Sequence, residues 1–372
     1  MIDRAVLYFA TPADFTSATT PVAGRPLAFR AIAAAIRAGA RRVGVPGRLR
    51  STDVGAAVTA SPRARAAVVW LEPGAPPEPG SVLLVPAAAA IPPAALATLL
   101  DVGPGAVLGC SRVNGAPALV VDAALAADLA AALAAGAAIG DDLDRALKGR
   151  ETTTVPDGWC VRVRDARDAA EVRARLHADL GSAIDTRLDV ALHRRLSRPI
   201  TRAAVALGVT PNMVSVASLL VGLAATWCFW RAEAGSALAG LILYIAAVTL
   251  DHADGEVARL TLTESRLGEW LDVAVDNVVH ALIVLAMGVT SQAVAGAGGW
   301  LGVVGLVGIL GSAVVAKAWP ATGAVGVGGR LEDLGSRDGF YAMLVLFIAA
   351  RALAPALLPW LMVVVAVGSN AY

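Results

Sequence analysis

Hydrophobic residues are distributed unevenly along this 372-residue chain. From residue 212 onward, long apolar segments alternate with short polar ones, and they approach the roughly 20 residues that a helix needs to cross a bilayer. The expected spans are Met213–Trp230, Ser236–Arg259, Leu267–Val289, Trp300–Ala318, Gly339–Leu353 and Ala356–Ala371. The pattern therefore predicts an all-α membrane domain of about six transmembrane helices over residues 212–372.

Residues 1–175 show a different pattern, in which short apolar runs alternate with Ala-rich stretches. The expected strands are residues 5–10, 41–45, 66–71, 82–86 and 118–121. The expected helices are residues 26–39, 93–100 and 122–136. Strands that alternate with helices are typical of an α/β domain with a mostly parallel sheet. We therefore expect a soluble, Rossmann-like α/β domain over residues 1–175.

Residues 176–211 connect these two regions. Within them, residues 185–205 mix Leu, Val and Ile with several Arg. This mixture predicts an amphipathic helix on the membrane surface, whose Arg side chains reach anionic headgroups. A plain linker helix is the alternative, but a bilayer span follows within a few residues.

Charge is scarce and is divided between the two regions. The chain is 57% hydrophobic and 16% charged, with 31 basic and 30 acidic residues, which excludes a disordered chain and a strongly basic nucleic-acid binder. Residues 212–372 contain seven Lys/Arg and eleven Asp/Glu, which leaves 31 − 7 = 24 basic and 30 − 11 = 19 acidic residues before them. The near-neutral total therefore combines a basic first part (+5) with an acidic second part (−4).

The positions of Lys and Arg predict the orientation in the membrane. They concentrate before the first expected span and in the second and fourth loops, whereas the alternate loops hold only Arg231 and Arg351. Because short cytoplasmic loops are enriched in Lys and Arg, the soluble domain and these loops should face the cytoplasm. The start of the chain lacks the pattern of a secretory signal peptide. We expect a multi-pass protein of the cell membrane.

Acidic residues gather where the second expected span ends and the third begins. Asp251 and Asp254 are three apart, which places them on one helical face, and Asp272 and Asp276 are four apart on the next helix. The short loop of residues 260–266 makes these helices antiparallel neighbours. We therefore expect the two carboxylate pairs to face each other.

Such a cluster is costly unless it binds something. A charge near the bilayer centre costs about 2.5–3.5 kcal/mol on insertion scales. Four carboxylates also repel one another, so they must stay partly protonated or bind cations. Oxygen ligands favour hard ions such as Mg²⁺, Mn²⁺ or Ca²⁺, and four Asp suffice to bridge two ions for phosphoryl transfer.

Small and basic residues share the helical faces of these acids. Gly255, Ala258 and Gly268 remove side-chain bulk, which would let a nucleotide lie against the helix backbone. Arg259 could pair with a phosphate through both of its terminal nitrogens. A single intramembrane Asp could be a helix–helix hydrogen bond or a proton relay, but eight positions at defined spacing across two helices favour a functional site.

The spacing Asp-x-x-Asp-Gly-x-x-Ala-Arg, eight residues, Gly-x-x-x-Asp-x-x-x-Asp resembles the signature of the CDP-alcohol phosphatidyltransferase family, also called CDP-alcohol phosphotransferases, at every position. Thr210-Pro211-Asn212 before the first span and Ser197-Arg198-Pro199 in the preceding segment are similar to that family too. The resemblance covers roughly residues 190–372.

The resemblance implies a reaction and a role for each residue. A CDP-linked alcohol binds, an acceptor hydroxyl attacks the phosphorus attached to the alcohol portion, CMP leaves and a phosphodiester forms. Asp251, Asp254, Asp272 and Asp276 would bind two divalent ions, Mg²⁺ or Mn²⁺, with Asp276 as general base. The residues implied to contact the CDP group are Asp251, Gly255, Ala258, Arg259 and Gly268.

The acceptor and the assembly are less constrained. Basic residues at the expected cytoplasmic face could bind an acceptor phosphate, although positive-inside topology alone would explain any one of them. They are Arg266, Lys317, Arg330 and Arg337. The donor could be CDP-diacylglycerol or CDP-inositol, and the acceptor an inositol compound or glycerol phosphate. The family resemblance also implies a homodimer.

The first 50 residues resemble the start of sugar-phosphate nucleotidyltransferases. There, a Gly-rich loop follows the first strand, and a Gly-Arg-Pro-Leu segment opens a helix. Here the loop position is occupied by residues 11–17, which contain no Gly, so backbone N–H groups could not approach a triphosphate closely. The expected domain is therefore a degenerate, catalytically silent relative. Its fusion to the membrane domain resembles the bifunctional inositol-phosphate cytidylyltransferase/di-inositol-phosphate-phosphate synthase arrangement.

Two other readings of the membrane domain remain open at the level of sequence. The Asp cluster could be the cation pathway of a transporter, or the chain could be an inactive, regulatory or scaffolding relative. The complete signature favours the transferase over both.

Overall fold

The computed structural model describes residues 2–74, 80–109, 117–155, 158–180, 189–318 and 337–370. The chain forms two compact units. The first unit contains residues 1–180 together with the segment Arg259–Thr263, and the second contains residues 181–258 and 264–372. The first is α/β, and the second is built from helices among its described residues.

A seven-stranded sheet forms the centre of the first unit, in the order β10-β8-β9-β6-β1-β4-β5. Its strands are β1 (Arg4–Tyr8), β4 (Arg42–Pro46), β5 (Val68–Leu71), β6 (Val82–Pro86), β8 (Ala106–Leu108), β9 (Ala118–Val121) and β10 (Thr153–Thr154). All neighbouring pairs are parallel except the two that involve β9. The predicted mostly parallel sheet is therefore confirmed.

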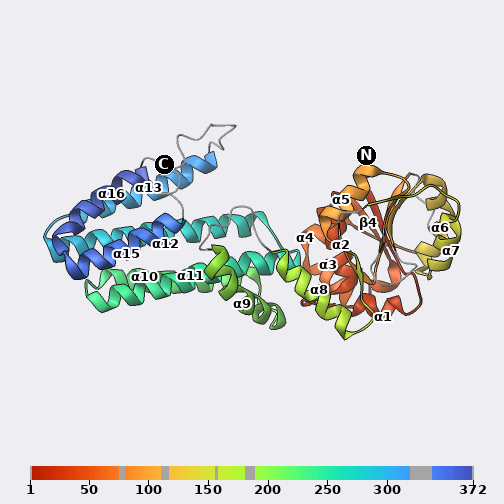
Figure 1. Ribbon diagram of the computed structural model, residues 1–372, viewed down its shortest axis with the longest axis horizontal. Coiled ribbons are helices and arrows are strands. Elements are labelled where there is room, and N and C mark those ends of the chain that lie inside the picture. Colours follow the sequence, from red (N-terminus) through yellow and green to blue (C-terminus); the bar gives the residue numbers. More distant parts are fainter. Residues whose placement is uncertain are drawn as a thin grey trace. The chain divides into compact units, whose positions relative to one another are not determined.

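Alternating side chains of the central strand β1 build a core on each face of the sheet. Ala5 and Leu7 point into the core formed with α2 (Leu27–Arg37), whereas Val6 and Tyr8 point into the core formed with α6 (Ala123–Ala135). Asp122 caps the start of α6 by accepting a hydrogen bond from Leu125 N, and Gly136 ends the helix at a φ of 63°. Figure 1 shows helices on both faces of the sheet.

Shorter elements complete the first unit. Its remaining helices are α1 (Asp14–Thr19), η1 (Gly47–Leu49), α3 (Asp53–Ala60), α4 (Pro62–Ala67), α5 (Pro93–Val102), α7 (Gly140–Leu147) and α8 (Ala166–Ala178). Two short antiparallel pairs, β2 (Pro21–Val22) with β3 (Arg25–Pro26) and β7 (Ala89–Ala90) with β11 (Val161–Arg162), lie outside the main sheet. The predicted strands and Ala-rich helices of the first 136 residues are all present.

Within its described residues, the second unit begins with two short helical elements and continues with six longer helices, and the predicted position of residues 185–205 on the membrane surface stays a prediction. The π-helical turn η2 (Asp189–His193) continues directly into α9 (Arg194–Ala206). The longer helices are α10 (Pro211–Trp230), α11 (Ala234–Thr261), α12 (Arg266–Ala295), α13 (Gly299–Ala318), α15 (Arg337–Leu353) and α16 (Leu358–Asn370), the last preceded by the short turn η3 (Pro355–Leu357). Large apolar side chains such as Phe229, Tyr244 and Phe347 fill the core between them.

Three helices of the second unit are long and apolar enough to cross a membrane within the described part of the chain. They cover residues Pro211–Trp230, Gly235–Thr261 and Arg266–Ala295. The other three expected spans also form helices, but the apolar stretches of α13 and α16 are shorter. The helical membrane region is thus confirmed, whereas the number of about six spans stays a prediction.

Helix ends in this region follow local chemistry. Thr210 accepts a hydrogen bond from Met213 N and caps α10, whose first residue is Pro211. Ser265 does the same for α12 through Gly268 N, at 3.0 Å. Gly296 ends α12 with a φ of 73°. The Ser265 cap fixes where α12 begins, and therefore which of its later residues face α11.

Candidate metal centre and active site

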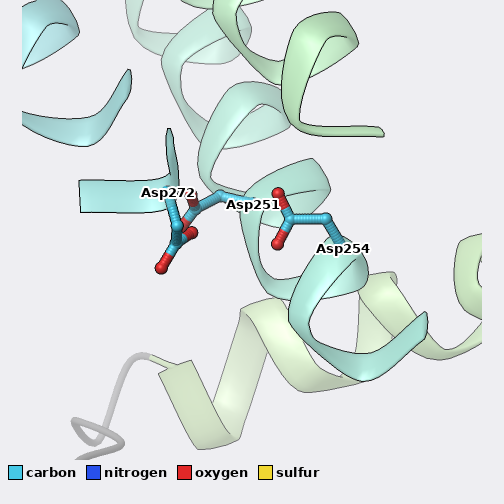
Figure 2. Close-up of side chains that lie close together, drawn as sticks. All are labelled: Asp251, Asp254 and Asp272. Atoms are coloured by element: carbon cyan, nitrogen blue, oxygen red, sulfur yellow. The ribbon is translucent and has the colours of Figure 1, made fainter. Parts of the chain in front are cut away.

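Three Asp side chains meet between α11 and α12. Asp251, Asp254 and Asp272 each offer one carboxylate oxygen, and these atoms all lie within 4.8 Å of one another. Figure 2 shows the three side chains gathered together, with the Asp254 carboxylate pointing toward the other two. The predicted facing of the two acidic helices is confirmed for these three residues.

The two Asp of α11 are buried, at 9% exposure for Asp251 and 5% for Asp254, and Asp272 is the least buried of the three. Ser215 of α10 donates a hydrogen bond to Asp254 Oδ2 at 2.5 Å, which orients that carboxylate. Three acids this close repel one another, so the cluster favours positive charge in its vicinity. Oxygen donors of this kind suit hard divalent cations.

Arg337, the first residue of α15, supplies one positive charge. Its Nη2 lies 3.0 Å from Asp251 Oδ2 and 3.7 Å from Asp276 Oδ2. Its Nη1 lies 3.1 Å from His252 Nε2 and 3.9 Å from Asp189 Oδ1. Arg337 was predicted as a possible acceptor ligand at the cytoplasmic face, and the structure places it directly against the acidic cluster.

Asp276 lies beside the three clustered Asp rather than among them. Its side chain is 32% exposed, so an incoming group can reach it. The ring of His280, one turn further along α12, has Nδ1 2.6 Å from Asp276 O and 3.3 Å from Asp276 Oδ1. Because Asp276 O only accepts, His280 Nδ1 carries the proton, and Tyr244 donates to His280 Nε2 at 2.6 Å.

A second group of polar side chains, from η2, α11 and α15, contacts Arg337 Nη1 through His252 and Asp189. Asp189 Oδ1 contacts His252 Nε2 at 2.8 Å, and the ring of His252 lies 5.4 Å from that of His193. His193 Nδ1 lies 3.0 Å from Thr249 Oγ1, and Tyr341 contacts its Nε2 at 2.9 Å. The turn η2 is therefore linked to the acidic turn of α11 through hydrogen bonds between side chains.

The remaining predicted residues have different positions. Gly255 and Ala258 lie on α11, and Gly268 opens α12 with its N–H bound to Ser265. Arg259 falls in the segment grouped with the first unit, where its Nη2 donates to Leu180 O at 3.3 Å. Arg266 is exposed at the start of α12.

Two predicted acceptor residues lie partly or wholly outside the described residues. Lys317 belongs to the last turn of α13, and its side chain lies outside the described residues. Arg330 falls wholly outside the described residues. A role for either of them in acceptor binding stays a prediction.

Sequence reasoning missed several residues that shape the site. Ser215, Asp189 and Tyr244 hydrogen-bond to Asp254, His252 and His280, from which they are 39, 63 and 36 residues away in the sequence. The available signal was their polarity, since a hydroxyl or carboxyl group within a mostly apolar helix requires a partner.

Comparison with known proteins connects the second unit with one family. Residues 208–368 match the model of the CDP-alcohol phosphatidyltransferase family. The chain is similar to the archaetidylinositol phosphate synthase of Pyrococcus horikoshii, with 34% identity over 88 residues that make up 24% of this chain and 45% of that protein. It is also similar to the CDP-diacylglycerol--serine O-phosphatidyltransferase of Mycobacterium leprae, with 39% identity over 82 residues, or 22% of this chain and 26% of that protein.

The chain therefore spans less than half the length of each of these curated relatives. The family match contains the whole acidic motif and all six longer helices except the last two residues of α16. The matching family and the Mycobacterium leprae relative are both named as phosphatidyltransferases. Residues 208–368, which include the three helices long and apolar enough to cross a membrane, are thus similar to the CDP-alcohol phosphatidyltransferase family.

Proposed function

We propose that this chain is an integral-membrane CDP-alcohol phosphotransferase, which transfers a substituted phosphate group from a CDP-alcohol to an acceptor hydroxyl. The observation that carries this proposal is the convergence of Asp251, Asp254 and Asp272 at the positions of the family motif. Clustered carboxylates can bind divalent cations, and these cations can neutralise the negative charge of a diphosphate donor.

The donor set fits divalent metal ions. All of its groups are carboxylates, two of them are buried, and Arg337 is one cation against several acids. In the proposal, Asp251, Asp254 and Asp272, together with the neighbouring Asp276, would hold two Mg²⁺ or Mn²⁺ ions. When bound, such ions would neutralise the donor diphosphate and stabilise the charge that develops on it during transfer.

The protein's own residues perform the remaining tasks. Asp276 accepts the proton from the acceptor hydroxyl, whose oxygen forms a new bond to the phosphorus that carries the donor alcohol. The bond from that phosphorus to the bridging oxygen breaks, and CMP leaves with the electron pair. The hydrogen bond from Ser215 holds Asp254 in place, and His280 Nδ1, which lies 3.3 Å from Asp276 Oδ1, helps to orient the Asp276 carboxylate.

Nucleotide binding is assigned to the small and basic positions of the motif. Gly255, Ala258 and Gly268 present little side-chain bulk, so the cytidine and ribose can lie against the helix backbones. Asp251 and Arg259 complete the set of residues assigned to the CDP group. Arg266, Lys317 and Arg330 remain assigned to the acceptor, whereas Arg337, through its contact with Asp251, is assigned to the edge of the metal site.

The substrate proposal follows the relatives. One relative is named for archaetidylinositol phosphate and the other for transfer from CDP-diacylglycerol to serine. We assign a CDP-diacylglycerol-type lipid as donor, with CDP-inositol as the soluble alternative. We assign an inositol compound as the first acceptor to test, with glycerol phosphate second.

The first unit is proposed to be a nucleotidyltransferase-like, Rossmann-like domain without catalytic activity. In place of a Gly-rich loop after β1, the chain forms α1, and Asp14 accepts hydrogen bonds from Ala10 N and Thr11 N at 2.8 and 3.2 Å. A buried carboxylate that already binds these N–H groups would repel a nucleotide phosphate. The proposal also includes a cytoplasmic active site in the cell membrane and a homodimer.

The decisive experiment is a substrate panel with purified protein. CDP-diacylglycerol and CDP-inositol are each combined with inositol, inositol phosphate, glycerol phosphate and serine in the presence of Mg²⁺ or Mn²⁺. CMP release is the readout, and mass spectrometry identifies the product. We expect acceptor-dependent CMP release and a phosphodiester product.

Asp276→Asn tests the assignment of the general base. We expect CMP release to fall about 10²- to 10⁴-fold, because the acceptor proton loses its base. Glu269→Gln is the matched control, since it removes one acid from an exposed position of the same helix. Equal activity of Asp276→Asn and wild type would refute the assignment of Asp276 as general base. Cation flux through the wild-type protein would favour a transporter, and a wild type that releases no CMP with any donor would favour an inactive relative.

A further inference from the structure

Glu256 is an acid within the motif that the proposed chemistry leaves without a role. It lies two residues after Asp254 on α11, and only 1% of its surface is exposed. At about 100° per residue, its side chain leaves the helix roughly 200° away from that of Asp254. Glu256 and Asp254 therefore point to opposite sides of the same turn of α11.

Among the described residues, Glu256 accepts hydrogen bonds from three side chains of α9. Arg194 Nη1 donates to Glu256 Oε1 at 2.8 Å, Ser197 Oγ donates to the same oxygen at 2.8 Å, and Thr201 Oγ1 donates to Oε2 at 2.6 Å. These three residues are spaced three and four apart, so they form one face of α9, and all three are buried. Both carboxylate oxygens are satisfied, and the charge of Glu256 is balanced by Arg194.

This arrangement constrains α11 in two ways. Three donors spread over two turns of α9 fix the position of Glu256 along the helix axis, and they fix the rotation of α11 about that axis. Asp254 is on the same turn and Asp251 is one turn earlier, so their directions are set by the same constraint. A misplacement of about 1 Å at reacting groups can cost roughly 100-fold in rate.

The outer face of α9 is basic. Arg195, Arg198 and Arg202 are exposed and repeat the spacing of the buried face, and Leu196 and Leu207 are exposed beside them. One face of α9 therefore binds α11, while the other remains available to the membrane surface. The buried face is the part that acts on the site.

We propose that Glu256 is a positioning residue, which locks α9 to α11 through Arg194, Ser197 and Thr201 and so holds Asp251 and Asp254 in the orientation that binds metal. This inference rests on the proposed function, because it assigns the geometry of the same site. The family motif leaves this position open, so the role belongs to the particular side chains that this chain places on α9.

The test measures metal binding separately from turnover. Mn²⁺ binding to full-length protein in detergent is followed by electron paramagnetic resonance, and the Mn²⁺ concentration for half-maximal CMP release is measured in parallel. We expect Glu256→Gln to weaken both about 10- to 100-fold, as is typical when a residue that orients metal ligands is lost. Glu269→Gln is again the control, with both values unchanged.

A double-mutant cycle separates positioning from general destabilisation. Arg194→Met alone leaves Glu256 as an unpaired buried charge, so it should weaken Mn²⁺ binding, and combining it with Glu256→Gln should restore part of the affinity. If Glu256→Gln does not fold, Thr201→Val removes one hydrogen bond and should weaken Mn²⁺ binding in the same direction but less.

The outcomes distinguish this inference from the function on which it rests. Variants that unfold at lower temperature but bind Mn²⁺ with wild-type affinity would overturn the positioning role and leave only a structural one. A wild-type protein that neither binds Mn²⁺ nor releases CMP would instead overturn the proposed function.

Discussion

The two units of this protein each bury acidic side chains, but the two acidic sites are constructed differently. In the first unit, Asp14 accepts hydrogen bonds from Ala10 N, Thr11 N and Thr11 Oγ1, and it pairs with the buried Arg162. In the second, Asp251, Asp254 and Asp272 share a small space that holds more negative charge than the neighbouring Arg337 can balance.

The difference teaches how to separate a structural acid from a functional one. Burial alone does not distinguish them, since Asp14 and Asp254 are 3% and 5% exposed. A buried carboxylate with all its hydrogen bonds and one counter-charge is a structural element. A cluster with surplus negative charge needs a ligand, and Glu256 with Arg194 shows that both kinds occur on α11 itself.

Removing metal gives the largest expected effect and tests the surplus charge directly. Exhaustive chelation should reduce CMP release to background, and added Mg²⁺ or Mn²⁺ should restore it, because the clustered acids then regain their cations. Chelation should not affect the first unit, so hydrogen exchange in residues 1–180 should stay unchanged. CMP release that persists after chelation would contradict a metal-bound cluster.

Asp14→Ala tests whether the buried acid of the first unit is structural rather than functional. We expect the free energy of unfolding of the first unit to fall by about 3–5 kcal/mol, because Arg162 is left as an unpaired buried charge. Hydrogen exchange of peptides that contain Ala10 and Thr11, measured on the full chain, reports this loss. CMP release at low temperature should keep its wild-type rate.

Arg150, which pairs with Asp122 on the surface at 2.7 Å, provides the control for that change. Because exposed ion pairs contribute little, Arg150→Gln should change stability by less than about 1 kcal/mol. A loss of CMP release in Asp14→Ala without a loss of stability would show that Asp14 has a functional role, and the distinction drawn from charge balance would fail.

Tyr244→Phe sharpens the comparison within the second unit. The Tyr244 hydroxyl fixes the ring of His280 through Nε2, and Nδ1 of that ring lies 3.3 Å from Asp276 Oδ1. Its removal should lower kcat about tenfold with little change in KM for the acceptor, since orientation of the base is weakened but binding is not. Tyr341→Phe, whose hydroxyl contacts His193 instead, is the control. Equal effects of the two changes would argue against a specific role for His280.

Local pattern predicted much of this molecule. The strands and Ala-rich helices of the first unit follow apolar runs, and α11 extends only two residues beyond each end of the predicted span Ser236–Arg259. The end of α12 was placed too early, because Thr290 and Ser291 read as polar. In the structure they donate to Phe229 O and Ala297 O, at 2.6 and 2.7 Å, so the helix continues to Ala295.

The site was predictable where its spacing is helical and unpredictable where it depends on tertiary structure. Intervals of three and four residues were enough to bring Asp251 and Asp254 to one face, and a short loop brought Asp272 opposite. Arg337 was expected as a possible acceptor-binding residue at the cytoplasmic face, and its contact with Asp251 joins residues 86 apart in the sequence. Similarly, nothing local to Glu256 indicates that its partners lie on α9.

The smallest expected effect concerns His193, a satisfied group beside the acidic cluster. Thr249 donates its hydroxyl proton to Ile245 O, so it accepts from His193 Nδ1, and Tyr341 donates to Nε2. The neutral ring is thus fully hydrogen-bonded. Burial and the neighbouring His252 lower the pKa of His193 to about 4, although Asp189 and Asp338 oppose the shift and Arg337 adds to it.

A lowered pKa sets the sign of the pH dependence. The unfolded ring takes up a proton near pH 6.5, whereas the folded ring does so only near pH 4. Between these values the unfolded state binds more protons, so this contribution to stability is lost as pH falls from about 6.5 to 4. Thermal unfolding of the full chain without metal should therefore show a steeper decline toward acid than that of His193→Gln. Identical declines in the two proteins would mean that His193 is not held neutral. His193 would then not be a buried group satisfied by its neighbours, as Asp14 is.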